Sequence, residues 1–174
     1  MPLRPKWIGE KGRIQNLSAY KEEGLEKEEQ IREILRQLLS SQKLTVLGTH
    51  QQGQPYGSLV AFAATPDLKH LIFATHRTTR KFANLRADSR VFMVFDNRSN
   101  RVADFRKAVA ATALGRAKEV KGRERKKFVN MYLAKHSHLK DFLSSPTCTL
   151  VRVRVQVYYV VSRFQKVFEL RMKP

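Results

Sequence analysis

The segment that decides the fold of this chain reads FATHRTTRKFANLR and runs from Phe73 to Arg86. It leaves an apolar strand, crosses a turn rich in threonine and arginine, and enters a run with helical spacing. The start of a helix offers unpaired N–H donors and a partial positive charge, and both suit a phosphate. Arg80 can hold two phosphate oxygens at once, and Lys81 adds a mobile charge. The alternative interpretation is a solvated basic helix start, because patterns of this kind are loose.

Apolar and alternating runs bounded by turn residues predict strands on both sides of this segment. We expect strands at residues 44–49, 56–64, 70–75, 90–95, 108–117, 150–161 and 164–170. The turns at residues 51–55 and 65–67 contain Gly, Pro and Asp, which favours consecutive hairpins. Several short strands at this spacing predict a barrel or a sandwich.

Two amphipathic helices are predicted beside these strands, at residues 21–39 and within residues 123–143. A shorter helix is expected over residues 80–86, with Thr78 or Thr79 as its cap. The sequence therefore predicts a mainly β chain with flanking helices, of the α+β class. Residues 1–20 lack periodicity and are expected to form an arm, and residues 21–174 a single domain.

The formal net charge of +19 is distributed unevenly. Residues 1–41 carry 8 basic and 7 acidic side chains, whereas the rest of the chain carries 26 and 8, a net charge of +18. Such a charge attracts polyanions and phosphorylated ligands. No standard nucleic-acid recognition motif is present, so a strongly cationic surface without that role is the simpler interpretation.

Residues that could carry catalysis or hold a metal are scattered. The five histidines have no cysteine or paired carboxylate at the spacing of metal ligands, so no metal site is predicted. The single cysteine, Cys148, is expected to be a small buried apolar side chain. No apolar run approaches the length of a membrane span and no signal peptide is recognised, so a cytoplasmic protein is expected. An enzyme with so few reactive groups needs a cofactor.

The order of these pieces resembles the FMN-binding split barrel of the pyridoxamine 5'-phosphate oxidase-like superfamily. The resemblance covers roughly half to two-thirds of the chain. Each piece is loose, and the order and spacing of the pieces together carry the resemblance. It is carried by four stretches: Leu44–Thr49, Gly53–Phe62, Leu71–Thr75 and Thr79–Val91. It fades after residues 113–117.

The resemblance implies which residues bind the cofactor FMN. The strand that follows the flavin ring matches residues 58–64, and its flavin contacts match Ser58, Leu59, Val60 and Ala61. The next strand offers Ala74 and Thr75 at the ring edge. The phosphate-binding pair matches Arg80 and Lys81, with Thr79 as a hydroxyl donor. The family resemblance also implies a homodimer that reacts with a small-molecule electron donor or acceptor.

Departures from the family pattern fall at positions that bind the substrate, whereas the positions that bind the cofactor phosphate are retained. The authentic oxidase has an arginine and a lysine where this chain has Leu59 and Ala64. The expected glutamine is not evident around Ala110, and no Arg-x-His pair follows near the C-terminus. We therefore expect a flavin reductase-like oxidoreductase, and not a genuine pyridoxamine phosphate oxidase.

Two alternatives remain open. The same fold can hold a deazaflavin or haem in place of FMN. A basic barrel can also bind nucleic acid, with Tyr158, Tyr159 and Phe164 as stacking platforms.

For the homodimer, the valine-rich strand at 150–161 and the small-residue strand at 108–117 are expected to supply the apolar surface.

Overall fold

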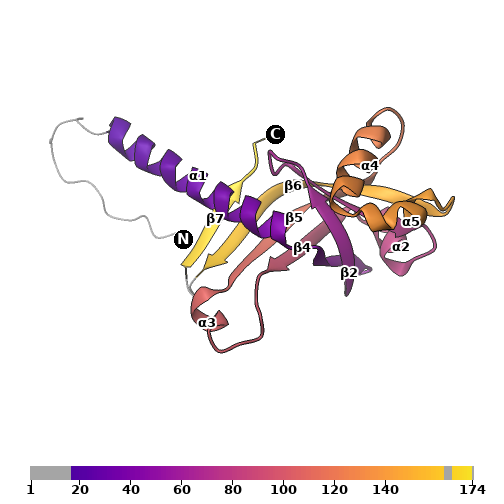
Figure 1. Cartoon of the computed structure of the whole chain (residues 1–174), viewed down its shortest axis with the longest axis horizontal. Helices are drawn as coiled ribbons and strands as arrows, with labels where there is room; N and C mark the ends of the chain where they lie inside the picture. Colours follow the sequence, from indigo (N-terminus) through magenta and orange to yellow (C-terminus); the bar gives the residue numbers. More distant parts are fainter. Residues whose placement is uncertain (1–16, 163–165, 174) are drawn as a thin grey trace, which may run out of the picture.

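The computed structural model describes residues 17–162 and 166–173 (Figure 1). Its strands are β1 (Leu44–Gln51), β2 (Gln54–Ala64), β3 (His70–His76), β4 (Arg90–Asp96), β5 (Val109–Glu119), β6 (Cys148–Ser162) and β7 (Lys166–Arg171). Its helices are α1 (Leu17–Ser41), α2 (Arg80–Ala87), α3 (Asp104–Lys107), α4 (Glu124–Lys135) and α5 (Lys140–Ser144), with a 3-10 turn, η1 (Ser137–Leu139), between the last two.

The strands form one antiparallel sheet in the order β3-β2-β1-β4-β5-β6-β7, and β3 also pairs with β6. This extra pairing closes β1 to β6 into a six-stranded barrel. The long strand β6 takes part in two pairings: residues 148–154 pair with β3, and residues 157–162 pair with β7. β7 therefore extends the sheet beyond the barrel, and the predicted α+β split barrel is confirmed.

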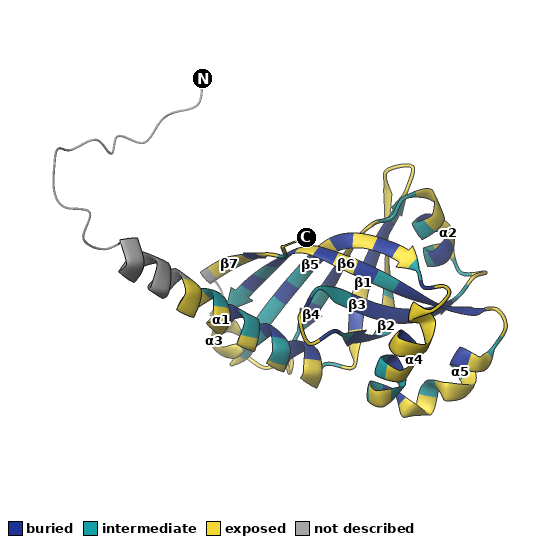
Figure 2. Ribbon diagram, turned by 90° about the horizontal axis from the view of Figure 1, so that it is seen from above, coloured by how far each residue is buried: buried dark blue, intermediate teal, exposed yellow. Residues whose placement is uncertain are grey.

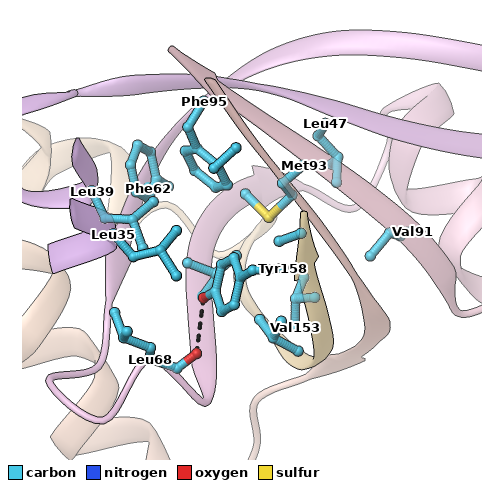
Figure 3. Packing of buried hydrophobic residues seen from close by; sticks show 14 of the residues in the cluster. Leu35, Leu39, Leu47, Phe62, Leu68, Val91, Met93, Phe95, Val153 and Tyr158 are labelled. Carbon is cyan, nitrogen blue, oxygen red and sulfur yellow. Dashed lines mark hydrogen bonds between the residues drawn. The ribbon is translucent and has the colours of Figure 1, made fainter. Parts of the chain in front are cut away.

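The barrel interior is apolar and is closed at one end by α1. Leu35 and Leu39 of α1 pack with Phe62 and Phe95, whose rings meet edge to face at 4.7 Å between centroids (Figure 3). Tyr158 is fully buried in the same core and donates a hydrogen bond of 2.8 Å to the carbonyl of Leu68. The charged helix α1 thus buries its one apolar stripe against the end of the barrel interior.

A second apolar cluster lies on the outside of the barrel, beneath α4 and α5. Phe128 and Tyr132 of α4 cover Ala63, Ile72 and Leu150 on three neighbouring strands. Figure 2 shows that exposed residues of α4 and α5 face away from the sheet. Cys148 is buried in this cluster, as predicted, and burial raises the pKa of its thiol.

Each predicted strand is present, with ends that differ from the prediction by two residues or fewer. The predicted N-terminal helix begins earlier, at Leu17, so residues 17–20 belong to it and not to the arm, whose residues 1–16 lie outside the described part. The helix expected within residues 123–143 is divided into α4, η1 and α5. The short α3 was not predicted. No helix within residues 17–162 and 166–173 is long and apolar enough to cross a bilayer.

Two sequence-based interpretations of the C-terminal strands are wrong. The valines of β6 at positions 151, 153, 155 and 160 are buried in the barrel core, so they do not form an apolar dimer surface. Tyr158 is buried too, so it cannot act as a stacking platform for bases, whereas Tyr159 is half-buried. Phe164 lies outside the described residues.

Candidate functional site

The barrel opens between β2 and β3. The ladder between these strands joins only residues 62–64 to residues 71–73 over the described ranges. Before Phe62, β2 pairs with β1 alone, and after Phe73, β3 pairs with β6 alone. The two strand edges at residues 58–61 and 74–76 therefore diverge, and α2 begins four residues after β3 ends.

The hydroxyl of Tyr132 bridges the point where the strands separate. Continuing the register places Ala61 opposite Ala74. Tyr132 Oη donates to the carbonyl oxygen of Ala61 at 3.4 Å, and the backbone N–H of Ala74 points toward Tyr132 Oη. Burial raises the pKa of Tyr132 to about 12, so the hydroxyl keeps its proton near neutral pH. One side chain of α4 thus replaces the next hydrogen bonds of the β2–β3 ladder.

Tyr132→Phe is expected to lower the free energy of unfolding by about 1–2 kcal/mol, because two buried backbone groups lose their partner. Urea denaturation of the two proteins measures this difference. Tyr158→Phe is the comparison, since it removes a fully buried hydroxyl that donates to the carbonyl of Leu68 at 2.8 Å and should cost at least as much. A loss for Tyr132→Phe below about 0.5 kcal/mol, the range of an ordinary surface substitution, would contradict the bridging role.

The N-terminus of α2 faces this opening without a side-chain cap. Thr79 occupies the cap position in an extended conformation and makes no capping hydrogen bond. Its hydroxyl instead donates to the carbonyl of His76 at 2.8 Å and lies 3.0 Å from Thr75 Oγ1. The carbonyl of Thr79 accepts from the N–H groups of Phe82 and Ala83. The first two N–H groups of the helix therefore have no backbone acceptor among the described residues.

Arg80 and Lys81 are the residues that carry those two N–H groups. Arg80 is exposed, and its guanidinium carbon lies 5.2 Å from the ring centroid of Tyr56 in β2. Lys81 is half-buried. This cation–π contact holds the guanidinium at the start of β2, on the far side of the opening from β3. The helix start therefore offers two N–H donors and two cationic side chains together.

The predicted residues of β2 divide between the two faces of the sheet. Val60 is buried in the barrel core, and Ser58 lies on the same inward face, with a buried hydroxyl that has no hydrogen-bond partner among the described residues. Leu59 and Ala61 lie on the outward face, and Leu59 is 67% exposed. A ligand in the opening can meet Ser58 and Val60 only through their backbone edge.

The predicted residues of β3 are buried on either side of that strand. Ala74 packs into the outer cluster beneath α4, and Thr75 faces the other way with its hydroxyl against Thr79. His76 follows, and its Nδ1 lies 2.8 Å from the Thr147 hydroxyl. The structure thus brings together Thr75, Thr79, Arg80 and the strand edges. It shows no side-chain contact that joins Ala74 to this group.

Two contributors to the opening were missed by sequence reasoning. Tyr132 falls within the helix predicted at residues 123–143 and Tyr56 within the strand predicted at 56–64, and neither was given a role at the site. No local pattern indicates either role, because both depend on how α4 and α2 dock on the barrel. The described residues contain no group of three or more His, Cys, Asp or Glu side chains that could hold a metal ion.

An exposed apolar face lies on the outside of β2, β1, β4 and β5. Its large members are between 37% and 67% exposed: Leu44, Val46, Leu59, Phe92 and Leu114. Val46 stands directly opposite Leu59, and Phe92 opposite Leu114. A Cβ on Gly48 would lie 2.0 Å from the Phe92 ring, so the missing side chain lets this ring lie flat on the sheet. We call these five side chains the apolar face.

Comparison with solved structures shows the same fold in proteins with little sequence identity. A haem-binding protein from Mycobacterium smegmatis superposes with a TM-score of 0.72 at 17% identity, over 80% of this chain and 57% of that one. This chain therefore spans less than two-thirds of that protein. An FAD-binding protein from Mesorhizobium loti gives 0.60 at 18% identity, over 73% and 89% of the two chains.

General stress protein 26 from Bacillus anthracis gives a TM-score of 0.62 at 19% identity, over 82% of this chain and 98% of that one. No curated protein sequence matches this chain. The family profile described as pyridoxamine 5'-phosphate oxidase matches residues 29–162, which include the whole barrel, the opening and α2. The chain therefore belongs to the pyridoxamine 5'-phosphate oxidase-like family of split barrels.

Proposed function

We propose that the chain binds FMN in the opening between β2 and β3 and acts as an FMN-dependent oxidoreductase. The observation that carries this proposal is the uncapped start of α2, with Arg80 and Lys81, beside two diverging strand edges. These groups fit a phosphate attached to a flat ring system. A helix start binds the phosphate, and backbone edges suit the polar rim of the ring.

Each part of the opening has a separate task in this proposal. The N–H groups of Arg80 and Lys81 and the Arg80 guanidinium hold the phosphate, with the Thr79 hydroxyl beside them. The backbone of residues 58–61 and 74–75 lies along the ring, and Leu59 and Ala61 give it an apolar neighbour. Bound FMN supplies hydride and electron transfer, which the protein's own side chains do not provide.

A visible absorption spectrum of the purified protein, before and after addition of FMN, tests the proposal. We expect a yellow protein with the two bands of an oxidised flavin, and saturable binding with one FMN for each protomer. Haem gives one intense band near the violet edge, and a deazaflavin gives a spectrum of its own. Preferential binding of either, or of neither, would overturn the FMN assignment.

The substrate is not expected to be pyridoxamine phosphate. That substrate brings a second phosphate beside the flavin, and a bound phosphate needs several cationic donors. Leu59 and Ala64 stand where the oxidase has basic residues, and Leu59 is exposed at the opening. We expect reduction by a nicotinamide or another small donor. Oxygen-dependent turnover of pyridoxamine phosphate should stay far below an ordinary enzyme rate, on the order of 1 per second.

We also propose that two copies pair through the apolar face, in a two-fold arrangement. Exposed apolar side chains gathered on one sheet face mark an interaction site. The face is continuous with the opening through Leu59, so pairing would cover both together. Sedimentation should show a dimer, and Leu59→Glu should shift it toward monomer. A monomeric wild-type protein at micromolar concentration with bound FMN would contradict the pairing.

A further inference from the structure

Like charges stand directly opposite one another on the outer face of the barrel. Across four neighbouring strands, Arg90 of β4 pairs with Arg116 of β5, Arg116 with Arg154 of β6, and Arg154 with His70 of β3. Side chains at directly opposed positions lie about 5 Å apart, and like charges there destabilise a sheet. A row of three arginines therefore costs stability in the isolated protein.

A second row of positive charge lies two residues further along the strands. Lys118 of β5 stands opposite Arg152 of β6. Residues two apart on a strand share a face and are separated by roughly 7 Å. We call the five cations of the two rows the cationic grid: Arg90, Arg116, Lys118, Arg152 and Arg154.

Acidic side chains reach only the margins of the cationic grid. Asp88 pairs with Arg90 at 2.6 Å, and Glu124 pairs with Arg152 at 3.1 Å. The three central cations are exposed and form no ion pair within residues 17–162 and 166–173: Arg116, Lys118 and Arg154. Within the described residues, the Arg116 guanidinium contacts the Ser89 hydroxyl at 3.5 Å. The positive charge at the centre is therefore available to an external anion.

The turn before α4 and the first residues of that helix add more positive charge beside the cationic grid. Glu124, the first residue of α4, contacts Arg152, so the start of the helix lies against the second row. The basic residues of the turn and the helix start are all exposed: Lys121, Arg123, Arg125, Lys126 and Lys127. The cationic grid itself acts on His70: burial lowers the pKa of this histidine most, and the nearby charges of Arg152 and Arg154 lower it further.

We propose that the cationic grid binds the phosphate backbone of a double-stranded nucleic acid. The three arginines of the first row cross two strand spacings, about 10 Å, which lies between the roughly 12 Å width of the major groove and the 6 Å width of the minor groove of a duplex. Their side chains can therefore reach phosphates on both strands. Four of the five cations are arginines, whose planar fork matches a phosphate.

The mode of binding follows from what the cationic grid contains. It presents charged side chains on a rigid sheet and has no aromatic side chain for stacking on unpaired bases. The contacts are therefore made to phosphates and carry no sequence information. An anionic membrane is less suitable, because no apolar side chain lies between the cations. The nearest exposed apolar residues, Phe92 and Leu114, belong to the apolar face assigned to the second copy.

Fluorescence polarisation with labelled duplexes of about 20 base pairs tests the proposal, using two unrelated sequences and a salt series. The variant Arg116→Gln/Arg154→Gln should weaken binding on the order of tenfold for both sequences. It should also reduce the slope of log K against log salt by about 2, one for each lost phosphate contact.

The matched control is Arg101→Gln/Arg106→Gln, which removes the same charge. These residues lie in and before α3, near the end of β4 and β5 that is far from the grid (Figure 1). The control should bind nearly as well as the wild type. Equal weakening by both variants would show a general charge effect and overturn the proposal. Binding to anionic vesicles without binding to duplexes would overturn it in favour of a membrane.

Thermal unfolding separates a binding defect from a folding defect. Because the grid substitutions remove opposed like charges, the Tm of Arg116→Gln/Arg154→Gln should stay the same or rise. Weaker duplex binding together with a retained Tm supports the proposal. Weaker binding that appears only together with a lower Tm would mean that these arginines support the fold, which contradicts it.

Discussion

Replacing Gly115 by alanine is expected to lower the free energy of unfolding by about 2–3 kcal/mol. Gly115 lies where the register between β5 and β6 shifts, next to Leu114. A Cβ built there would lie 2.4 Å from the carbonyl oxygen of Arg154 and 2.9 Å from Val153 Cγ1. The first of these atoms is backbone, so the strands themselves have to separate, and overpacking in a closed sheet is costly. Urea denaturation measures the loss.

Gly57→Ala is the matched control for this prediction. Gly57 also lies in a strand, but the nearest atom to its added Cβ is Val46 Cγ1 at 3.9 Å, an ordinary contact. Its substitution should change stability by less than about 0.5 kcal/mol. Similar losses for the two variants would mean that replacing a strand glycine, and not the close approach of the Arg154 backbone, lowers the stability.

The fold was largely predictable because its strands carry strong local patterns. The alternation of valine with arginine or glutamine in β6 fixes which side chains point inward, and the turn residues fix where the first hairpins end. The alternation does not tell whether the valine side of β6 lines the inside of a barrel or contacts another molecule. The valines of β6 were assigned to a dimer surface for this reason, whereas the barrel buries them.

The candidate site was predictable only in part. The segment Thr79-Arg80-Lys81 could be predicted as a phosphate site from sequence alone, because a helix cap and two cations are adjacent there. The bridge made by Tyr132 depends on the docking of α4 against strands about 60–70 residues earlier in the chain. The cationic grid depends on the register between three strands, and that register includes a shift at Gly115. Pairings of this kind arise from the three-dimensional fold and leave no local pattern.

Arg80→Ala is expected to weaken FMN binding by about 1.5–3 kcal/mol, or roughly 10- to 150-fold, the range for hydrogen bonds to charged groups. Isothermal titration of wild type and variant with FMN measures the change. Riboflavin lacks the phosphate, so it should bind the wild type poorly and respond little to the substitution. Arg86→Ala, at the other end of α2, removes the same charge and should leave FMN affinity nearly unchanged.

The comparison of the two ligands decides what Arg80 does. Its guanidinium also contacts the Tyr56 ring, so the substitution can disturb the start of β2 as well as the phosphate. A disturbed strand would weaken FMN and riboflavin alike, because both share the ring that lies along the β2 edge. A lost phosphate contact weakens FMN alone. Equal losses of affinity for FMN and riboflavin would therefore mean that Arg80 supports the structure and does not bind the phosphate. A loss of affinity for FMN alone would assign the phosphate to the start of α2.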